Sequence, residues 1–381
     1  MGLYTEEHNI FRRTFKRFLE KEIQPHLEEW EEKRLVPAWF FTKMGEQGYL
    51  APWIEEKYGG AEVGFEYSGI ILNEISKLDV GLGTIICVHS DIVPAYVASY
   101  GTEEQKEKWL PGASSGELVY AVAMTEPNAG SDLQAITSTA VKKGDTYVIN
   151  GTKTFITNGM NAGITVVAAK TDPKAIPPFK GVSLFVVEDG TPGFIKSRKL
   201  DKVGIHNNDT AELVFEDCVI PAANLIGEEG KGFFYMMQKL QQERLVCAMV
   251  AQGGAERILE ETVNYAKSRK AFGVSIGNLQ HNLFKLAEMA TEVELGRTFL
   301  EDLLADHISG KDVVTKVSMA KYWISEMVNH IAYHGLQIHG GYGYMEEYPI
   351  ARFFRDVRSL TIVAGTTEVM KLIIGRNLLR D

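Results

Sequence analysis

Apolar residues recur every three or four positions through the first third of the chain, which is the period of an amphipathic α-helix. The first run follows Thr5, a residue type that caps helix N-termini, and repeats at Phe11, Phe15 and Phe18. We therefore expect a helical N-terminal block. Its further helices are predicted at 37–48, 65–78, 80–100 and 103–110, with a loop at 52–64.

The pattern changes near residue 118, where short β-branched and aromatic runs replace the helical period. Two of these runs, 147–149 and 154–156, flank Asn150-Gly151, a pair that tolerates the positive φ angles of a type I′ turn. We expect a β-hairpin there. Further strands are predicted at 164–169, 181–187 and 211–215.

Long helical runs resume at Lys231, with breaks at the glycines of 272–278, at Gly310 and at 340–343. They predict a bundle of about four helices. The chain is therefore expected to be an α+β protein with a helical domain at 1–117, a β domain at 118–227 and a helical bundle at 228–381.

Composition is that of an ordinary globular protein, with 45% hydrophobic and 24% charged residues. The net charge of −10 argues against nucleic acid or an anionic membrane as the main partner. No apolar run is expected to approach the roughly 18–20 residues of a membrane span. The three cysteines lie far apart without a C-x-x-C pair, so the sequence predicts no disulfide framework and no metal site. A bacterial cytoplasm is the simplest interpretation, and a mature mitochondrial matrix form stays open.

Several segments carry candidate chemistry. The run Met124–Asp132 offers hydroxyls at Thr125 and Ser131 and a close backbone approach at Gly130, although Glu-Pro and Asn-Ala-Gly also suit a plain surface turn. Arg269, which opens an R-x-x-F-G motif, has a planar guanidinium that suits a diphosphate, and the alternative is a solvated basic pair at a helix end. The Gly-rich run 337–343 follows no predicted strand, which excludes a dinucleotide-binding βαβ fingerprint.

Glu243-Arg244 and Ala364-Gly365-Thr366 complete the set. These motifs together resemble the acyl-CoA dehydrogenase family over the whole chain. Most members carry the catalytic Glu immediately before the Gly-Thr pair, where this chain has Ala364. The long-chain and isovaleryl subgroups instead carry Glu before Arg on an earlier helix, and Glu243 stands there. The resemblance, closest to bacterial long-chain-like members, implies an N-terminal α domain, a middle β-barrel-like domain and a C-terminal four-helix bundle.

The resemblance also implies an FAD cofactor, a CoA thioester substrate and a set of binding residues. Ala364 would still offer its backbone N–H to the thioester carbonyl. The residues implied to bind FAD are Met124, Thr125, Gly130, Ser131, Phe155, Ile156, Thr157, Arg269, Phe272, Gln280, Gln337, Gly340, Gly341, Thr366 and Glu368. Those implied to bind substrate are Thr84, Cys87, Val88, Ser131, Arg244, Ala364 and Gly365.

The expected reaction is α,β-dehydrogenation of an acyl-CoA to a 2-enoyl-CoA. Glu243 would act as base, an electron-transfer flavoprotein would accept the electrons, and the protein would be a homotetramer. Glu243 could alternatively pair with Arg244 or Lys239 on a solvated helix face. Helical spacing predicts that Asp91 shares a face with Thr84, Cys87 and Val88, where a carboxylate is unusual beside an acyl chain. Asp91 is either a pocket-rim residue or a second base that would permit 1,4-elimination from an alicyclic enoyl-CoA. A non-catalytic acyl-CoA-binding homologue is the remaining alternative.

Overall fold

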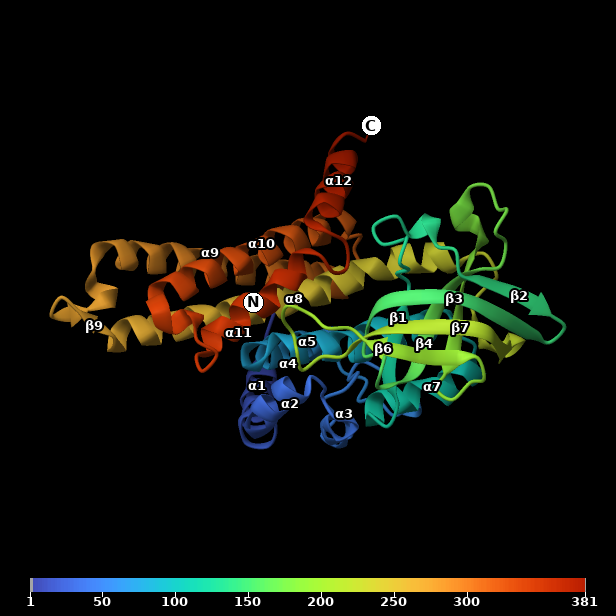
Figure 1. The fold of residues 1–381 in the computed structure, drawn as a ribbon, viewed down its shortest axis with the longest axis horizontal. Helices are drawn as coiled ribbons and strands as arrows, with labels where there is room; N and C mark the ends of the chain where they lie inside the picture. Colours follow the sequence, from blue (N-terminus) through green and yellow to red (C-terminus); the bar gives the residue numbers. More distant parts are fainter. Residues whose placement is uncertain (1–2, 381) are drawn as a thin grey trace.

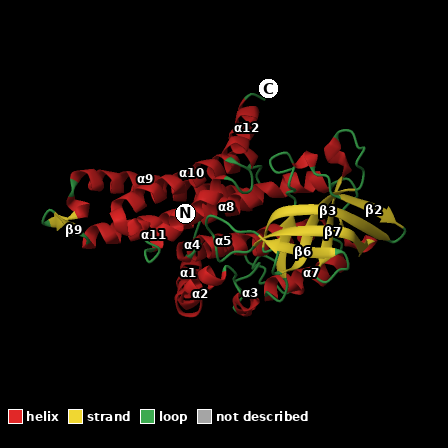
Figure 2. Cartoon of the chain, viewed as in Figure 1, coloured by secondary structure: helices red, strands yellow, loops and turns green. Residues whose placement is uncertain are grey.

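The computed structural model describes residues 3–380, and it contains the three predicted parts (Figures 1 and 2). The strands gather in one body at one end of the long axis, and the long helices of the bundle extend away from them toward the other end (Figure 2). The N-terminal helices lie against both. This arrangement confirms the α+β fold class and its order of domains.

The N-terminal part begins with α1 (Glu6–Phe18), which is capped at Thr5 as predicted. The Thr5 hydroxyl accepts from the backbone N–H of His8, and the His8 ring accepts from the backbone N–H of Thr5 in return. The predicted helix at 103–110 continues to Ser115. The other helices of this part are α2 (Leu27–Lys33), α3 (Ala38–Glu46), α4 (Phe65–Leu78), α5 (Val80–Ile86), α6 (Val93–Tyr100) and α7 (Glu103–Ser115).

The predicted helix over 80–100 is not one regular α-helix. Between α5 and α6 lies η4 (Cys87–Ile92), a segment of π-helix. The whole stretch Val80–Tyr100 has the length and apolar composition of a membrane span, with a mean hydropathy of 1.5. This corrects the prediction that no apolar run approaches that length. Since 94% of its most apolar window is buried inside the protein, the stretch serves as a core helix here.

The β domain is a strongly curved eight-stranded sheet in the order β6-β7-β3-β2-β4-β5-β8, with β1 parallel to β4. Its concave side encloses a core of its own that includes Tyr147, Phe185 and Phe215. The strands are β1 (Val119–Ala123), β2 (Thr139–Lys143), β3 (Thr146–Thr157), β4 (Ala162–Lys170), β5 (Val182–Glu188), β6 (Phe194–Lys199), β7 (Thr210–Pro221) and β8 (Leu225–Ile226).

The predicted hairpin at Asn150-Gly151 is wrong. Strand β3 runs through both residues, and its antiparallel partner β2 is reached instead through the turn at Gly144 and Asp145. The bulge here lies in β7, which has one residue more than β3 between neighbouring pairs, and Asp217 has a φ of 47° there. The Asn150 side-chain amide donates to Asp217 Oδ1 (3.1 Å), and its Oδ1 accepts from the Asp217 backbone N–H (2.8 Å). Asn150 and Gly151 therefore stand opposite a bulge instead of forming a turn, a difference that sequence alone does not show.

The C-terminal part is a bundle built around α8 (Gly232–Ser268), whose 37 residues extend along most of the molecule (Figure 1). A small hairpin of β9 and β10 lies at the end of the bundle farthest from the β domain, and α12 projects away from the body (Figure 1). The remaining elements are β9 (Lys270–Ala271), β10 (Val274–Ser275), α9 (Gln280–Ile308), α10 (Val314–His339), α11 (Pro349–Asp356) and α12 (Thr367–Leu378).

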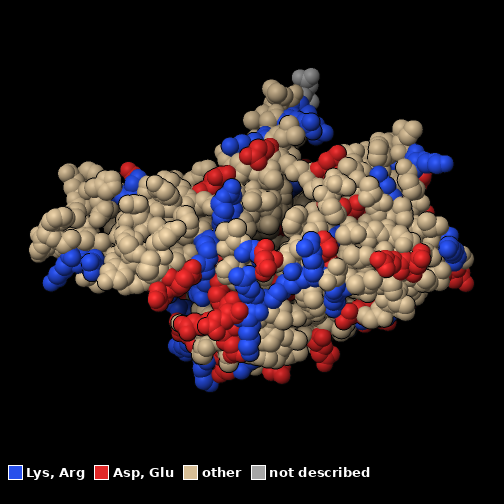
Figure 3. Space-filling model, in the orientation of Figure 1, with Lys and Arg blue, Asp and Glu red and all other residues tan. Residues whose placement is uncertain are grey.

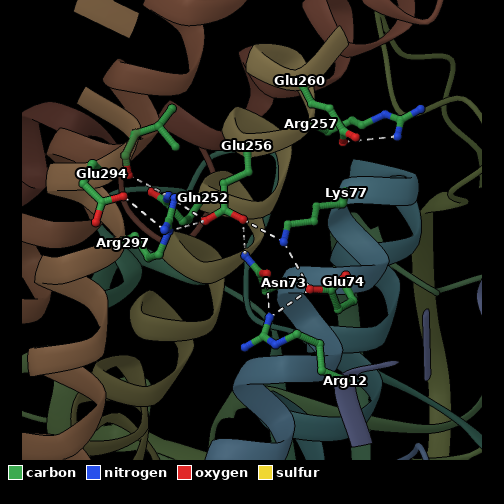
Figure 4. Close-up of polar contacts among 11 residues, drawn as sticks. Arg12, Asn73, Glu74, Lys77, Gln252, Glu256, Arg257, Glu260, Glu294 and Arg297 are labelled. Carbon is green, nitrogen blue, oxygen red and sulfur yellow. Dashed lines mark hydrogen bonds and ion pairs between the residues drawn. The ribbon is translucent and has the colours of Figure 1, made fainter. Parts of the chain in front are cut away.

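A polar cluster fastens the N-terminal helices to the bundle (Figure 4). Glu256 of α8 pairs with Lys77 of α4 at 2.8 Å and with Arg297 of α9 at 3.3 Å. Glu74 of α4 pairs with Arg12 of α1 at 2.8 Å and also with Lys77. Burial acts to raise the pKa of Glu256, but Lys77 and its other partners outweigh burial and lower it. Four helices thus meet through one network of alternating acidic and basic side chains.

The bulge makes a specific stability prediction. A Cβ at position 151 would lie 2.2 Å from Ser138 Oγ and 2.8 Å from Ser138 Cα, at a φ of 150°. We expect Gly151→Ala to destabilise the protein by about 2–4 kcal/mol through this collision and backbone strain. Urea unfolding followed by circular dichroism would measure it. The matched control is Gly190→Ala, where φ is also positive but nothing lies within 4 Å, and it should cost less than about 1 kcal/mol. Equal losses of unfolding free energy in the two variants would show that the contact with Ser138 is not the cause.

Candidate active site

Glu243 lies on the buried side of α8 and is only 6% exposed. Burial raises its pKa to about 7, opposed by a hydrogen bond from Tyr96 and by the charges of Arg244 and Lys239. Within residues 3–380, neither Arg244 nor Lys239 forms an ion pair with it. The alternative of a solvated surface pair does not describe this carboxyl group. Its pKa is that of a group that can accept a proton near neutral pH.

The loop before α12 meets α8 at Arg244, the residue after Glu243. Arg244 is buried, and its Nη2 lies 3.9 Å from the position that a Cβ on Gly365 would occupy. Lys321 of α10 donates to the carbonyl oxygen of Gly365 at 2.6 Å and so ties the loop to α10. Ala364 has a φ of 53°, and its backbone N–H donates to no acceptor in the described part of the chain. The backbone N–H groups of Gly365 and Thr366 have no acceptor there either, so Ala364 is one of several free N–H donors on this loop, at the predicted position.

The helix expected to line the acyl pocket also approaches Glu243. The thiol of Cys87 donates to the carbonyl oxygen of Thr84 at 3.1 Å. Its neighbour Cys247, one turn beyond Glu243 on α8, and burial both raise the pKa of Cys87. Thr84 is partly exposed, whereas Cys87, Val88 and Asp91 are buried. The prediction that all four residues share one α-helical face is corrected. Cys87–Ile92 is π-helical, so the regular α-helical spacing ends at Cys87.

Asp91 is 1% exposed, and its Oδ1 has no hydrogen-bond partner among the described residues. Burial raises its pKa to about 7, against the opposing effects of Ser68 and Trp53. Both of these neighbours belong to the N-terminal helices and the loop before them, whereas Gln242 of α8 reaches only the backbone carbonyl of Asp91. Its carboxyl group therefore faces away from α8, toward α4 and the loop that contains Trp53.

The run Met124–Asp132 is held by a buried ion pair. Lys153, which is fully buried, donates to Glu126 Oε1 at 2.8 Å and to the carbonyl oxygen of Met124 at 3.0 Å. Glu126 also accepts from Thr137 and from the backbone of Ser138. The predicted FAD-binding residues Thr125, Gly130 and Ser131 stay accessible beside this fixed segment. A Cβ on Gly130 would meet nothing within 4 Å, which leaves room for a ligand to approach the backbone.

Phe155 extends this accessible surface. It has a φ of 60° and a side chain that is 68% exposed, at a point where the pairing of β3 with β7 shifts register. A phenyl ring in a left-handed backbone conformation and open to water is unfavourable on its own, which is typical of a binding position. Ile156 is buried and Thr157 partly buried behind it. The next residue, Asn158, joins the strand to α5 through the carbonyl of Ile85.

A second set of predicted FAD-binding residues surrounds a cavity of about 480 Å³ at the other end of the bundle. Arg269 stacks over Tyr342 there at 5.4 Å, and Gly340 and Gly341 have open space where a Cβ would stand. Phe272 has a φ of 53° and is 93% exposed. Gln280 and Gln337 are also exposed nearby in the chain. A guanidinium, bare glycine backbone and an uncovered aromatic ring suit a diphosphate with an attached purine.

One chain does not bring these two sets together, because β9 and the β domain lie at opposite ends of the molecule (Figure 1). Thr366 and Glu368 belong to neither set. They begin α12, where the Thr366 hydroxyl accepts from the backbone of Val369, and they follow directly after Ala364 and Gly365.

Sequence reasoning missed three residues that build the site. Tyr96 was not recognised because the π-helical segment before it breaks the helical period. Lys321 and Lys153 are buried lysines, and no sequence signal marks them, because lysine is ordinarily expected on the surface.

Comparison with known proteins agrees with this geometry. The chain matches the acyl-CoA dehydrogenase N-terminal domain over residues 5–117, the middle domain over 121–218 and the C-terminal domain over 230–379. The mitochondrial long-chain specific acyl-CoA dehydrogenase of Sus scrofa is 45% identical over 379 residues, which are 100% of this chain and 88% of the relative.

Two solved structures extend the comparison. The acyl-CoA dehydrogenase of Geobacillus kaustophilus is 56% identical, with a TM-score of 0.98 over 99% of both chains. A glutaryl-CoA dehydrogenase from Mycobacterium smegmatis in complex with FADH2 is 28% identical, with a TM-score of 0.93 over 99% of this chain and 95% of that one. The chain belongs to the acyl-CoA dehydrogenase family. It is an FAD-dependent oxidoreductase that acts on acyl-CoA.

The raised pKa of Asp91 predicts a pH-dependent stability effect. Between about pH 4 and pH 7 the folded protein keeps the Asp91 proton that the unfolded chain releases, so this group lowers stability as pH rises through that window. Asp91→Asn has no proton to lose at this position. Its unfolding midpoint, expressed relative to that of wild type, should therefore be higher at pH 8 than at pH 4.5. The full effect would be up to about 4 kcal/mol. Thermal unfolding at the two pH values measures it, with the exposed Asp145→Asn as control. If the difference in unfolding midpoint between Asp91→Asn and wild type is the same at both pH values, Asp91 is not a buried acid with a raised pKa.

Proposed function

We propose that Glu243 is the general base of this dehydrogenase and that it removes the α-proton of the acyl-CoA thioester. The observation that carries this assignment is a buried carboxyl group with a pKa of about 7, next in the chain to Arg244, which lies beside the loop whose N–H at Ala364 is free. The product of α-proton and β-hydride removal is the 2-enoyl-CoA.

The free N–H of Ala364 would donate to the thioester carbonyl oxygen. This bond strengthens as the α-proton leaves and negative charge develops on that oxygen. Lys321, which donates to the carbonyl oxygen of Gly365, and Arg244, which lies beside Gly365, hold the loop that carries this donor. FAD, when bound, supplies the acceptor for the hydride from Cβ. The chain's own residues thus take the proton, polarise the carbonyl and keep the reacting carbons away from water.

Met124, Thr125, Phe155, Ile156 and Thr157 would hold the flavin ring, with Gly130 and Ser131 approaching the phosphates. Thr84, Cys87 and Val88 would contact the acyl chain. We assign the other end of the same cofactor to Arg269, Phe272, Gln280, Gln337, Gly340 and Gly341 of a second subunit. Arg269 immediately precedes β9 and shares a cavity with Gly340 and Gly341, and Figure 1 places β9 far from the β domain of its own chain.

An oligomer follows from this division, and we propose a homotetramer. Large apolar side chains are exposed along the outer helices, among them Leu283 and Phe284 of α9 and Leu378 of α12. In Figure 3 charges crowd over the N-terminal helices, while the bundle end of the molecule is largely uncharged. An uncharged, apolar helical surface of this kind is typical of a subunit contact.

We further propose an electron-transfer flavoprotein as the electron acceptor and a bacterial cytoplasm as the location. The site is closed to water at Glu243, which favours transfer to a protein partner over direct reaction with oxygen. Relatives occur both in bacteria and in mitochondria.

A second candidate reaction is the 1,4-elimination from an alicyclic enoyl-CoA with Asp91 as base. Its pKa of about 7 favours it, and its orientation toward α4 disfavours it. Asp91→Asn would then lose oxidation of a cyclohexene-type enoyl-CoA and keep oxidation of saturated acyl-CoA through Glu243. A non-catalytic acyl-CoA-binding homologue would need neither the raised pKa of Glu243 nor the free N–H of Ala364.

Glu243→Gln keeps the shape of the side chain and removes its basicity. We expect the variant to retain FAD and bind acyl-CoA, yet to bleach the flavin at least about 100-fold more slowly under anaerobic conditions with octanoyl-CoA or palmitoyl-CoA. Stopped-flow absorbance measures the rate. Gln238→Glu, five residues earlier on α8, is the control for a change of charge nearby. Reduction of the Glu243→Gln flavin within a few-fold of wild type would contradict the assignment.

The proposed division of the FAD site predicts that oligomer and cofactor are lost together. Leu283→Asp combined with Phe284→Asp places two charges in the apolar α9 surface and should lower both the mass in light scattering and the FAD content. Ile176→Asp, on a loop where this side chain is 90% exposed, is the matched control and should change neither. A monomeric wild-type protein with a full complement of FAD would contradict the proposal.

A further inference from the structure

Tyr96 of α6 is the one side chain in residues 3–380 that hydrogen-bonds the carboxyl group of Glu243. We propose that Tyr96 is a positioning residue for the base: its hydroxyl fixes Glu243 Oε1 and leaves Oε2 to take the α-proton. This inference rests on the function proposed above for Glu243 and deepens it.

The geometry of the pair is that of a strong hydrogen bond. The Tyr96 hydroxyl lies 2.6 Å from Glu243 Oε1, and both side chains are buried, Tyr96 completely. Such a distance is typical of a hydroxyl that donates to an ionised carboxylate. Burial, together with the nearby Glu243 charge, raises the pKa of Tyr96 well above its usual value, so the phenol keeps its proton and stays a donor.

The second oxygen of Glu243 is different. Oε2 makes no hydrogen bond to any described residue, and it is not among the fully enclosed polar atoms that lack a partner. It is therefore the oxygen with remaining access to the site. A carboxylate with one oxygen anchored and one free is held in a single orientation, which is what proton abstraction from a fixed carbon requires.

The π-helical segment explains how Tyr96 reaches this position. A π-helical turn contains one residue more than an α-helical turn, so everything after it is rotated by about 100° relative to a continuous α-helix. Cys87–Ile92 is such a segment, and it ends four residues before Tyr96. Without it, the helix that begins at Val80 would direct Tyr96 away from α8. This gives the irregular segment a function in the site.

Other titratable and charged groups also act on Glu243. Arg244 and Lys239 lower its pKa from α8, and Cys247 on α8 and Cys87 on η4 lie close enough to be affected by its charge. None of these four hydrogen-bonds the carboxylate in the described chain. Removing the Tyr96 hydroxyl therefore removes the one bond that favours the ionised form, while burial, which disfavours it, stays.

The test compares Tyr96→Phe with Tyr100→Phe in the FAD-loaded enzyme. Tyr100 lies one turn later on α6 and donates to Gln238 at 2.6 Å, so the control loses the same group from the same helix without touching Glu243. Anaerobic flavin reduction by octanoyl-CoA or palmitoyl-CoA is measured from pH 5.5 to pH 9. For Tyr96→Phe we expect a roughly 10-fold lower rate at pH 7, with the acid limb shifted upward by about one pH unit. The affinity for acyl-CoA and the Tyr100→Phe profile should match wild type.

A second measurement replaces Tyr96 alone with 3-fluorotyrosine, a nearly isosteric and more acidic phenol. As a stronger donor it should shift the acid limb downward, opposite to Phe, and this remains measurable if Tyr96→Phe loses FAD. The proposal is overturned if both replacements leave the limb where wild type has it, or if Tyr100→Phe shifts it equally. Failure of the base assignment is distinct, because Glu243→Gln would then still reduce the flavin.

Discussion

The active site depends on a carboxyl group that the fold keeps out of water. Glu243 would ordinarily be ionised and weakly basic at neutral pH, and its burial on α8 raises its pKa to about 7. In that burial α6, through Tyr96, and the π-helical segment pack against one part of a 37-residue helix. The polar cluster around Glu256 fastens α1, α4 and α9 to the same helix farther along (Figure 4).

The same constraint explains why the loop at Ala364 is compatible with an active enzyme. With no carboxylate of its own, the loop contributes backbone only, and Lys321 fixes it through the carbonyl of Gly365. The proposed proton acceptor and the proposed carbonyl donor therefore come from different parts of the chain, α8 and the loop. The carboxyl group on α8 and the N–H of the loop are held by separate contacts. Their relative position is fixed because both elements pack against the same core.

The sequence predicted the elements better than their connections. Local signals such as Thr5 before α1 and the glycine breaks between the bundle helices correspond to real boundaries. Asn150-Gly151 misled because the pair suits a turn locally, and only its pairing with Asp217, the bulged residue of a distant strand, shows that it stays within β3. Of the site, the family motifs identified Glu243 and Ala364. The partner Tyr96 could not be predicted, since a π-helical segment changes which residues face α8 without leaving a pattern in the sequence. The division of the FAD residues between two ends of the molecule is likewise visible only in three dimensions (Figure 1).

The most direct measurement is exchange of the α-protons of an acyl-CoA analogue in D₂O, followed by proton NMR. Sulfur in place of Cβ prevents hydride removal, so exchange reports proton abstraction by the FAD-loaded protein alone. The account predicts rapid exchange with wild type and exchange slower by at least about 100-fold with Glu243→Gln. Equal exchange rates in the two proteins would show that another group removes the α-proton and would contradict the account.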